Sequence, residues 1–306
     1  MHPASGNAPM EGAAVISHEM VEVNGARLHV ARAGQGRPLI LLHGWPEFWF
    51  TWHPIMDRLQ DRYELIAPDL RGFGDSDKPT RDLGPEDLAA DIEALIALLP
   101  EAPVGLIAHD VGASVAQVVA RRSPDLVAGL FMFNFVYPGI GQRFYTPEHL
   151  TRVWHTLFNQ SEIAAPLLRG SPDGIRLFVT HFLRLWAHNK EAFDQATVDA
   201  YVANMEKPGN LEGGFAYYRG AAAFRAREHE GNETVEPITV PTAVRWTEED
   251  VALDVAWTDR LDEFFTDLDF ATFPGAGHFP HHERPEQAAQ EIARFFDRVE
   301  RQGWNR

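Results

Sequence analysis

The chain has 306 residues, enough for one large domain or two small ones and for a substantial buried apolar core. Acidic residues outnumber basic ones by 44 to 27, and the net charge of −17 disfavours nucleic acid, anionic lipid and polyanionic substrates as partners. The sequence has no cysteine, which excludes disulfides, zinc fingers, iron–sulfur centres and a cysteine nucleophile.

The N-terminal residues 1–14 are rich in Ala, Gly and Pro and lack the basic and apolar regions of a signal peptide. We therefore expect a disordered leader over 1–14. The longest apolar runs, such as 111–120, are shorter than the roughly 20 residues that cross a bilayer. No membrane partner is expected, and the cytoplasm is the default location.

The first part of the chain alternates between predicted strands and predicted helices. Two imperfectly alternating segments, 15–23 and 26–33, flank Asn24-Gly25, a pair typical of a two-residue hairpin turn. The elements expected after this hairpin are buried strands at 38–43, 63–68, 104–108 and 129–135, and helices at 85–99 and 113–122. This alternation indicates βαβ units and a mostly parallel sheet.

The alternation stops at about residue 138. From there to residue 224 the patterns are helical and contain no convincing strand, which predicts an inserted helical cap. The remaining expected elements are strands at 241–246 and 270–273, an amphipathic helix at 285–299 and a solvated acidic loop at 228–236. The predicted division is a core domain of 15–137 and 226–306 and a cap domain of 138–225.

The segment Ala108-His109-Asp110-Val111-Gly112-Ala113 lies between a predicted buried strand and a predicted helix. Small residues two positions before and after Asp110 permit the tight turn of a nucleophile elbow, which projects the central side chain above the sheet. The start of the helix stabilises negative charge there, and a carboxylate can attack an sp³ carbon to form an ester. The alternative is an ordinary Asp that caps the helix.

Two further loops follow predicted strands and carry groups suited to the same chemistry. The loop His43-Gly44-Trp45-Pro46-Glu47 can direct a backbone N–H at a tetrahedral intermediate, although a Gly-Pro turn is the simpler interpretation of this loop alone. The loop at 273–280 holds His278 among flexible glycines, a position suited to a general base. The nearby His281 and His282 are interpreted as solvated loop residues.

The motifs occur in an order that resembles the α/β-hydrolase superfamily: HGWPE at 43–47, DLRGFGDSDKP at 69–79, HDVGA at 109–113 and PGAGHFPHHERPE at 274–286. The Asp in the elbow and the run HGWPEFW resemble its epoxide hydrolase branch, and the resemblance covers about residues 22–296. It implies the α/β-hydrolase fold, a mostly parallel eight-stranded sheet with helices on both faces and an inserted helical lid. The site is expected between this lid and the C-terminal ends of the strands.

The resemblance also implies roles for individual residues. Asp110 would be the nucleophile, and His278 would activate the water that hydrolyses the ester. The backbone N–H groups of Trp45 and Val111 would form the oxyanion hole, and the Trp45–Pro46 peptide bond is expected to be cis. No cofactor beyond water and no metal ion is implied.

An acid that orients His278 is implied at one of two positions. The first position, after the strand that precedes the lid, is occupied by Asn134, which cannot ionise. The second lies in Thr247-Glu248-Glu249-Asp250, where the usual pattern is Gly, two residues and Asp, so Asp250 is chosen. Glu248 and Glu249 remain alternatives.

A ring-opened alkoxide needs a hydrogen-bond donor, and the family usually supplies two lid tyrosines. Tyr218 matches one of them, whereas the adjacent Tyr217 is expected to point elsewhere, and His155 stands at the position of the other tyrosine. This His/Tyr pair is similar to an atypical epoxide hydrolase subgroup, and a lid His also helps to hold the halide in haloacetate dehalogenases. Simple packing within the lid is the alternative for His155.

Epoxide hydrolysis is the expected activity, with a small apolar epoxide and water as partners and a homodimer left open. Dehalogenation by the same Asp is one alternative. Haloacetate dehalogenases carry Arg directly after the nucleophile and again three residues later, and haloalkane dehalogenases carry Trp after it, but this chain has Val111 and Ser114. A non-catalytic small-molecule binder is the other alternative, against which the intact Asp110 and His278 argue.

Overall fold

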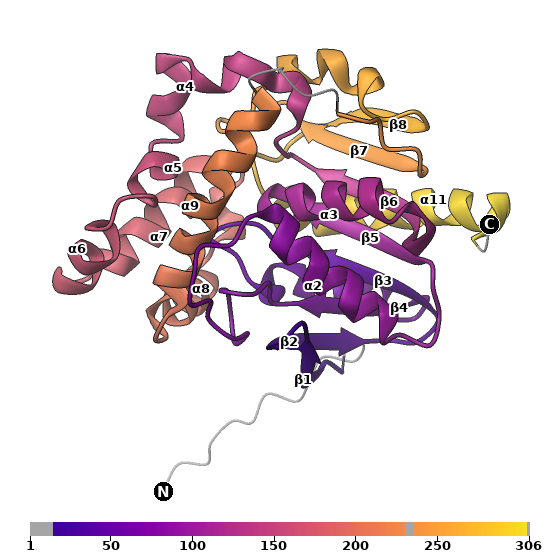
Figure 1. Ribbon diagram of the computed structural model, residues 1–306, viewed down its shortest axis with the longest axis horizontal. Coiled ribbons are helices and arrows are strands. Elements are labelled where there is room, and N and C mark those ends of the chain that lie inside the picture. The colour runs from indigo at the N-terminus through magenta and orange to yellow at the C-terminus, as the bar shows by residue number, and fades with distance from the viewer. Residues whose placement is uncertain (1–14, 230–234, 305–306) are drawn as a thin grey trace, which may run out of the picture.

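The computed structural model describes residues 15–229 and 235–304 of the chain (Figure 1). The leader expected at 1–14 lies outside the described residues, and so does the middle of the acidic run at 228–236.

Eight strands form one sheet in the order β1-β2-β4-β3-β5-β6-β7-β8. The strand β2 pairs antiparallel with both β1 and β4, and the remaining pairs are parallel. The expected eight-stranded, mostly parallel sheet is thus confirmed. The strands are β1 (Ser17–Val23), β2 (Ala26–Ala33), β3 (Arg37–Leu42), β4 (Tyr63–Pro68), β5 (Val104–His109), β6 (Val127–Phe133), β7 (Thr242–Thr247) and β8 (Leu268–Phe273).

The predicted hairpin between β1 and β2 turns at Asn24-Gly25. Both residues have positive φ angles, 46° for Asn24 and 73° for Gly25, and this left-handed region is the one that Asn and Gly adopt most readily.

Helices cover both faces of the sheet, as predicted. The helices α2 and α3 pack together on one face, and α1 and α11 pack together on the other (Figure 1). The helices around the sheet are η1 (Trp49–Trp52), α1 (His53–Leu59), α2 (Pro85–Ala97), α3 (Asp110–Arg122), η2 (Pro124–Leu126), η5 (Val255–Glu263), α10 (Pro280–Glu283) and α11 (Pro285–Gly303).

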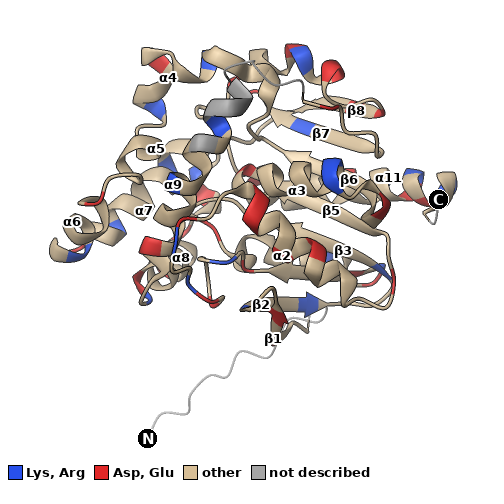
Figure 2. Cartoon of the chain, viewed as in Figure 1, with Lys and Arg blue, Asp and Glu red and all other residues tan. Residues whose placement is uncertain are grey.

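The central strands are apolar on both sides because each side faces a layer of helices. In β3, Ile40 and Leu42 belong to the core under α2 and α3, whereas Leu39 and Leu41 belong to the core under α1 and α11. Figure 2 shows the central strands almost free of charged residues. Continuous apolar runs of this kind are what a parallel sheet with two covered faces requires.

Between β6 and β7 the chain forms helices only, from Pro138 to His229. We call this stretch the helical segment. It comprises η3 (Pro138–Tyr145), α4 (Pro147–Arg152), α5 (His155–Phe158), α6 (Ala164–Gly170), α7 (Gly174–Trp186), η4 (Lys190–Ala192), α8 (Gln195–Glu206) and α9 (Asn210–His229).

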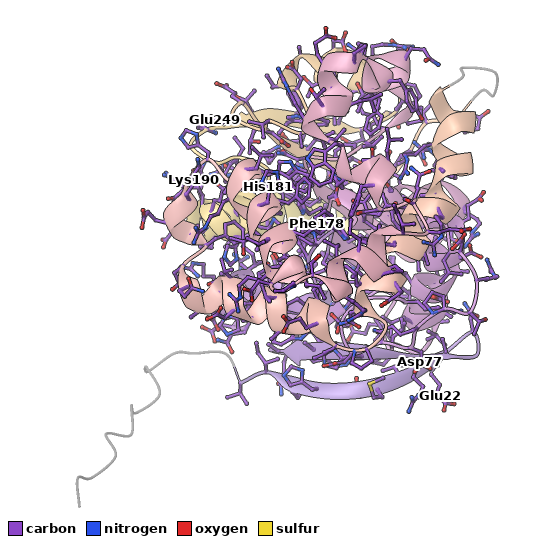
Figure 3. All side chains as sticks on the ribbon, turned by 90° about the vertical axis from the view of Figure 1, so that its left-hand side faces the viewer. Glu22, Asp77, Phe178, His181, Lys190 and Glu249 are labelled. Atoms are coloured by element: carbon purple, nitrogen blue, oxygen red, sulfur yellow. The ribbon has the colours of Figure 1, made fainter. Side chains whose placement is uncertain are left out.

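The helical segment lies over the loops that follow the parallel strands. Figure 3 views the molecule from the side of this segment, where Phe178 and His181 of α7 lie in front of the sheet. The end of α7 is tied to the loop after β8, since the Trp186 carbonyl accepts the His278 N–H at 2.9 Å. No helix in the described parts of the chain has both the length and the apolar character needed to cross a bilayer.

Candidate active site

Asp110 occupies a sharp turn between β5 and α3. Its φ angle is +48°, a left-handed conformation that costs free energy in a residue other than glycine. The turn packs so closely that a Cβ on Gly112 would lie 2.3 Å from the Leu42 carbonyl oxygen, and one on Gly44 would lie 2.6 Å from the Asp110 Cβ. The small residues around Asp110 are therefore required by the geometry of a nucleophile elbow.

The two carboxylate oxygens of Asp110 have different surroundings. Oδ1 accepts the Trp45 backbone N–H at 3.0 Å, and the Trp45–Pro46 peptide bond is cis, as predicted. Oδ2 lies 3.8 Å from Nε2 of His278, too far for a direct hydrogen bond. One oxygen is thus held by a backbone donor, and the other faces an imidazole across a gap.

His278 lies on the loop after β8 and is buried. Its Nδ1 lies 2.8 Å from Oδ2 of Asp250, whose Oδ1 accepts the Ala252 N–H at 2.7 Å. Burial disfavours the charged imidazolium, but the Asp250 carboxylate, with a smaller effect from Asp110, outweighs burial and raises the pKa of His278 to about 9. Glu249 instead accepts the Gly275 N–H at 3.3 Å, so the acid that the structure brings to His278 is Asp250.

Asn134 connects the turn at Asp110 to the Asp250 loop, a function that the sequence does not suggest. Its carbonyl accepts the Asp110 N–H at 3.2 Å, and its side-chain Nδ2 donates to Asp250 Oδ2 at 2.7 Å. Nδ2 also lies 2.7 Å from Thr247 Oγ1, which donates to the Gly277 carbonyl at 2.8 Å. The Thr that replaces the usual Gly therefore joins a buried hydrogen-bond network.

The interpretation of His281 and His282 as solvated loop residues is wrong. His281 is fully buried, and its Nε2 lies 3.0 Å from Oε1 of Glu47. His282 is half-buried, stacks on Phe193 with ring centroids 4.6 Å apart, and donates to the Ala192 carbonyl at 3.1 Å. The loop after β8 folds inward, so even its polar residues are taken from solvent, and single-residue polarity could not reveal this.

Glu47 is a buried carboxylate that links three of the site's loops. Its Oε2 accepts the Gly44 N–H at 2.7 Å and lies 2.8 Å from His109 Nδ1, while His109 Nε2 lies 2.8 Å from the His278 carbonyl. Burial alone would raise the pKa of Glu47, but His109 and His281 lower it well below its usual range. This connection holds the loops that carry Trp45, Asp110 and His278 in register.

Glu47, His109 and His281 form the one cluster of potential metal ligands in the described part of the chain. One ligand atom each from Glu47, His109 and His281 lies within 4.8 Å of the other two. However, both ring nitrogens of His109 and both oxygens of Glu47 already have hydrogen-bond partners within the protein. The group therefore fits a hydrogen-bond network better than a metal site.

His155 and Tyr218 come from two helices of the helical segment and meet in the interior. His155 Nε2 and the Tyr218 hydroxyl are 3.1 Å apart, and both residues are buried. The imidazole of His155 stacks on the Trp45 indole, with ring centroids 4.9 Å apart and an interplanar angle of 8°. The structure therefore places the pair over the loop whose backbone N–H holds Asp110.

Both members of the pair are neutral at pH 7. Burial, together with the nearby His278, lowers the pKa of His155 well below its usual value. Burial and the Asp110 carboxylate raise the pKa of Tyr218 well above 10. A neutral imidazole and a phenol carry one polar hydrogen each, and their mutual bond uses one of the two, which leaves one to donate to a ligand.

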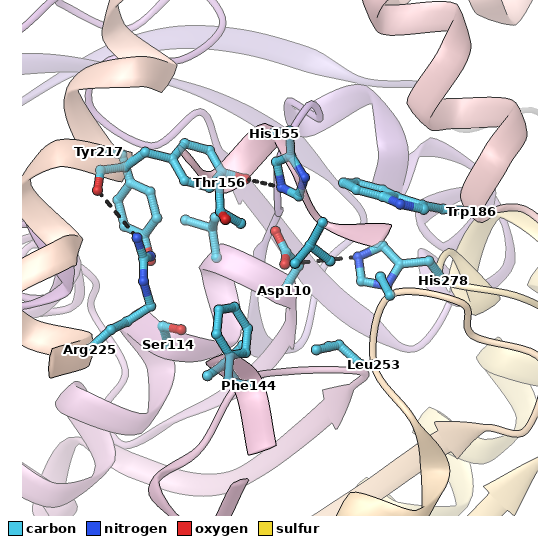
Figure 4. A pocket seen from close by; sticks show the side chains of 15 residues that line it. Asp110, Ser114, Phe144, His155, Thr156, Trp186, Tyr217, Arg225, Leu253 and His278 are labelled. Carbon is cyan, nitrogen blue, oxygen red and sulfur yellow. Dashed lines mark hydrogen bonds and ion pairs between the residues drawn. The ribbon is translucent and has the colours of Figure 1, made fainter. Parts of the chain in front are cut away.

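Asp110, His278, His155 and Tyr218 line one pocket (Figure 4). Tyr217 also lines it, contrary to the expectation that this residue points elsewhere. The remaining lining residues are Val111, Ser114, Val136, Phe144, Val153, Thr156, Trp186, Arg225, Ala252 and Leu253. An apolar pocket with a few convergent polar groups is typical of a small-molecule site.

Known proteins share this architecture. Residues 39–291 match the family model described as the alpha/beta hydrolase family. A soluble epoxide hydrolase from Corynebacterium sp. (strain C12) is 31% identical over 290 residues, which are 92% of this chain and 97% of that protein.

Solved structures agree with the sequence matches. Cfl2 from Burkholderia cenocepacia has a TM-score of 0.82 at 30% identity, over 91% of this chain and 95% of that one. The epoxide hydrolase VrEH1 from Vigna radiata has a TM-score of 0.79 at 26% identity, over 92% of this chain and 98% of that one. Together with the fold and the geometry of the pocket, these matches establish that the chain belongs to the alpha/beta hydrolase family, in its epoxide hydrolase branch.

Proposed function

We propose that this protein hydrolyses epoxides to vicinal diols through an ester formed on Asp110. The observation that carries the proposal is the neutral, hydrogen-bonded pair of His155 and Tyr218 in the same pocket as Asp110 and His278. A carboxylate, a histidine base and a neutral donor pair are the groups that ring opening followed by ester hydrolysis requires.

In the first step, Asp110 Oδ2 attacks a ring carbon of the epoxide. The new C–O bond forms as the bond from that carbon to the ring oxygen breaks, and the ring oxygen takes a proton from the hydroxyl of Tyr218. His155 Nε2, 3.1 Å from the Tyr218 oxygen, donates its hydrogen to that oxygen and so stabilises the phenolate that the transfer leaves. Oδ2 is the oxygen suited to attack, because Oδ1 is occupied by the Trp45 N–H.

In the second step, His278 Nε2 takes a proton from water, and the resulting hydroxide attacks the carbonyl carbon of the ester. Negative charge then develops on Oδ1, where the Trp45 N–H already donates and the Val111 N–H completes the oxyanion hole. Collapse of this intermediate breaks the acyl C–O bond. His278 returns its proton to the departing diol oxygen. The Asp110 carboxylic acid formed by the collapse loses its proton to solvent and the Tyr218 phenolate regains one, so both groups return to their starting states.

The charge on Asp110 changes the pKa of His278 between the two reaction steps. In the free enzyme, Asp110 and Asp250 both raise the pKa of His278, which reaches about 9. Ester formation removes the negative charge of Asp110 and with it one of these contributions, so the pKa of His278 falls when a neutral base is needed. The helical segment acts as a cap domain (138–225) that supplies His155 and Tyr218 and excludes bulk water.

A single-turnover experiment in H₂¹⁸O tests the ester route. With enzyme in excess over an uncharged epoxide, the first diol formed carries an unlabelled oxygen from Asp110, and ¹⁸O appears in the Asp110 carboxylate. Direct attack of water on the epoxide would instead label the diol in the first turnover. Asp110→Ala is the matched control and is expected to form no diol.

Dehalogenation is the second candidate function. It is favoured by Trp186, which lines the pocket and whose buried indole N–H has no partner among the described residues, so it can donate to a halide. The two functions diverge in the product. Release of chloride or fluoride from haloalkanes or haloacids, without diol formation from any epoxide, would select dehalogenation.

A further inference from the structure

The pocket contains a positive charge that the expected apolar substrate does not explain. Arg225 of α9 lines the same pocket as Asp110 and His278, and it is half-buried. Figure 4 shows Arg225 on the side of Asp110 away from His278. The catalytic steps assigned to the carboxylate, the base and the donor pair make no use of this guanidinium.

Arg225 has no carboxylate partner among the described residues. Its Nη2 donates to the Tyr218 carbonyl at 3.2 Å, and its guanidinium carbon lies 5.8 Å from the centre of the Tyr218 ring. Four other arginines of the helical segment donate to a carboxylate: Arg143 to Asp259, Arg169 to Glu212, Arg176 to Asp199 and Arg219 to Asp82. Arg152 and Arg184 also have no carboxylate partner among the described residues, but both are exposed and neither lines this pocket. In a chain with 44 acidic residues, a pocket arginine without such a partner has donors left for a ligand.

A second donor lies on the same side of the pocket. Ser114 follows Asp110 by four residues on α3, so one helical turn separates them, and its hydroxyl has no partner among the described residues. Ser114 and Arg225 line the same pocket, and in the view of Figure 4 both appear on the side of Asp110 away from His278. Phe144, Val136 and Leu253 supply apolar lining to the same pocket. The pocket thus has a reactive end, apolar walls and a cationic end.

We propose that Arg225, assisted by Ser114, binds a carboxylate on the substrate, so that the preferred substrates are epoxides that carry one carboxylate group. This inference rests on the proposed epoxide hydrolysis and names its substrate class. A planar guanidinium matches the geometry of a carboxylate. A single guanidinium suits a singly charged group, and the net charge of −17 opposes the entry of a more highly charged one.

The position of the guanidinium also connects charge recognition with ring opening. The charge of Arg225 acts on both His155 and Tyr218, in each case lowering the pKa, although burial is the largest influence on both residues. A carboxylate seated on Arg225 would therefore lie close to the donors that hold the ring oxygen. The substrate would be anchored at one end while Asp110 attacks at the other.

The test compares ω-epoxy carboxylates of graded chain length with the primary amides of the same acids, which are similar in size and uncharged. For the chain length that fits best, the wild-type kcat/KM is expected to be higher for the acid than for the amide. A hydrogen bond to a charged group contributes about 1.5–3 kcal/mol, which corresponds to roughly a 10- to 150-fold preference. Arg225→Gln is expected to remove this preference, and Arg225→Lys to retain part of it.

Arg219→Gln is the matched control, because Arg219 lies on the same helix but pairs with Asp82 outside the pocket. For Arg219→Gln, the ratio of kcat/KM for the acid to kcat/KM for the amide should equal that of the wild type. The inference is overturned if the wild type opens the amides but prefers no acid, or if Arg225→Gln keeps the preference.

Different results would show that epoxide hydrolysis itself, rather than the carboxylate preference, is wrong. If no epoxide of either kind is opened, epoxide hydrolysis fails as the function of this site. If haloacids alone are turned over and that turnover depends on Arg225, the carboxylate site stands but its substrate is a haloacid, and the inference as stated is overturned.

Discussion

The pocket is built from two regions that hold their functional groups in different ways. On the sheet side, Asp110, Asp250 and His278 follow strand ends and are fixed by hydrogen bonds from buried partners such as Asn134. On the side of the helical segment, His155 is fixed mainly by aromatic contacts, stacking on Trp45 at 4.9 Å and packing edge-on to Trp186 at 4.7 Å.

This contrast between the two regions separates the groups proposed for the reaction from those proposed to select the substrate. Hydrogen bonds are directional, so a group held by several of them has one position, whereas apolar contacts tolerate substitution if volume is kept. In the proposed mechanism, ester formation and hydrolysis therefore depend on the sheet side. Ring-oxygen binding and the proposed substrate class depend on the helical segment, where residues can change without disturbing the sheet.

The largest expected effect in this comparison comes from the sheet side. Asp250→Asn leaves His278 without the charge that orients and stabilises its imidazolium, and a similar change in a serine protease triad lowers kcat by about 10⁴-fold. We expect ester hydrolysis to slow by that order while ester formation is much less affected, so that quenched samples show accumulated ester by mass spectrometry. Glu249→Gln, a neighbouring acid bonded to Gly275, is the control and should hydrolyse the ester normally.

A substitution in the helical segment should have a smaller effect, and this effect should fall on ester formation rather than on ester hydrolysis. Tyr218→Phe removes the proposed acid for the ring oxygen, and loss of one such donor costs about 2.7–4 kcal/mol, or roughly 10²- to 10³-fold. The quantity to measure is the single-turnover rate of ester formation. His155→Tyr should retain more of this rate than His155→Phe.

Tyr201→Phe is the control for Tyr218→Phe, because Tyr201 is equally buried but does not line the pocket. It should leave ester formation unchanged. If Tyr218→Phe forms the ester at the wild-type rate, Tyr218 of the helical segment does not protonate the ring oxygen.

The pH dependence of stability tests the electrostatics of the sheet side. Because the pKa of His278 is raised from 6.5 to about 9 on folding, its protonation stabilises the fold fully below pH 6.5, and this contribution is lost as pH rises through 9. The expected loss is on the order of 3 kcal/mol, at 1.36 kcal/mol per pKa unit. Urea unfolding of the wild type and of His278→Gln at pH 6.5 and pH 9.5 measures it, and a difference between the two proteins that does not change with pH would refute it.

The smallest expected effect concerns the strained turn at Asp110. Asp110→Gly should be more stable than Asp110→Ala by roughly 1 kcal/mol, since the left-handed conformation costs a residue other than glycine about 1–2 kcal/mol and glycine loses about 0.5–1 kcal/mol of entropy. At Ser114, which lies inside α3, Ser114→Ala should instead be more stable than Ser114→Gly, because glycine is unfavourable within a helix. Equal stability of the two Asp110 variants would mean that the turn stores no strain.

The sequence predicted the sheet and its helices because continuous apolar runs and helical periodicity recur along the core. It also predicted the cis peptide bond at Trp45–Pro46, by resemblance, and this expectation is confirmed. The structure brings Asp110, His278 and Asp250 together as the resemblance implied, and it brings His155 to Tyr218.

The residues that the sequence did not reveal act through contacts between segments far apart in the chain. Asn134 occupies one of the two positions expected for the acid and cannot ionise, so the sequence predicts no role for it, and its bonds to the Asp250 loop join residues more than a hundred positions apart. The sequence predicts a solvated His281 because polarity alone does not show which loops fold inward. For Arg225, the sequence does not show that the described residues provide no carboxylate partner, because that depends on the three-dimensional contacts.

The ester on Asp110 can be detected in the mass of His278→Gln after incubation with one uncharged epoxide. We expect a protein heavier by the mass of one intact epoxide, with the adduct on the peptide that contains Asp110. The double variant with Asp110→Ala should show no adduct. An unmodified His278→Gln protein, under conditions in which the wild type converts that epoxide to its diol, would contradict the ester on Asp110.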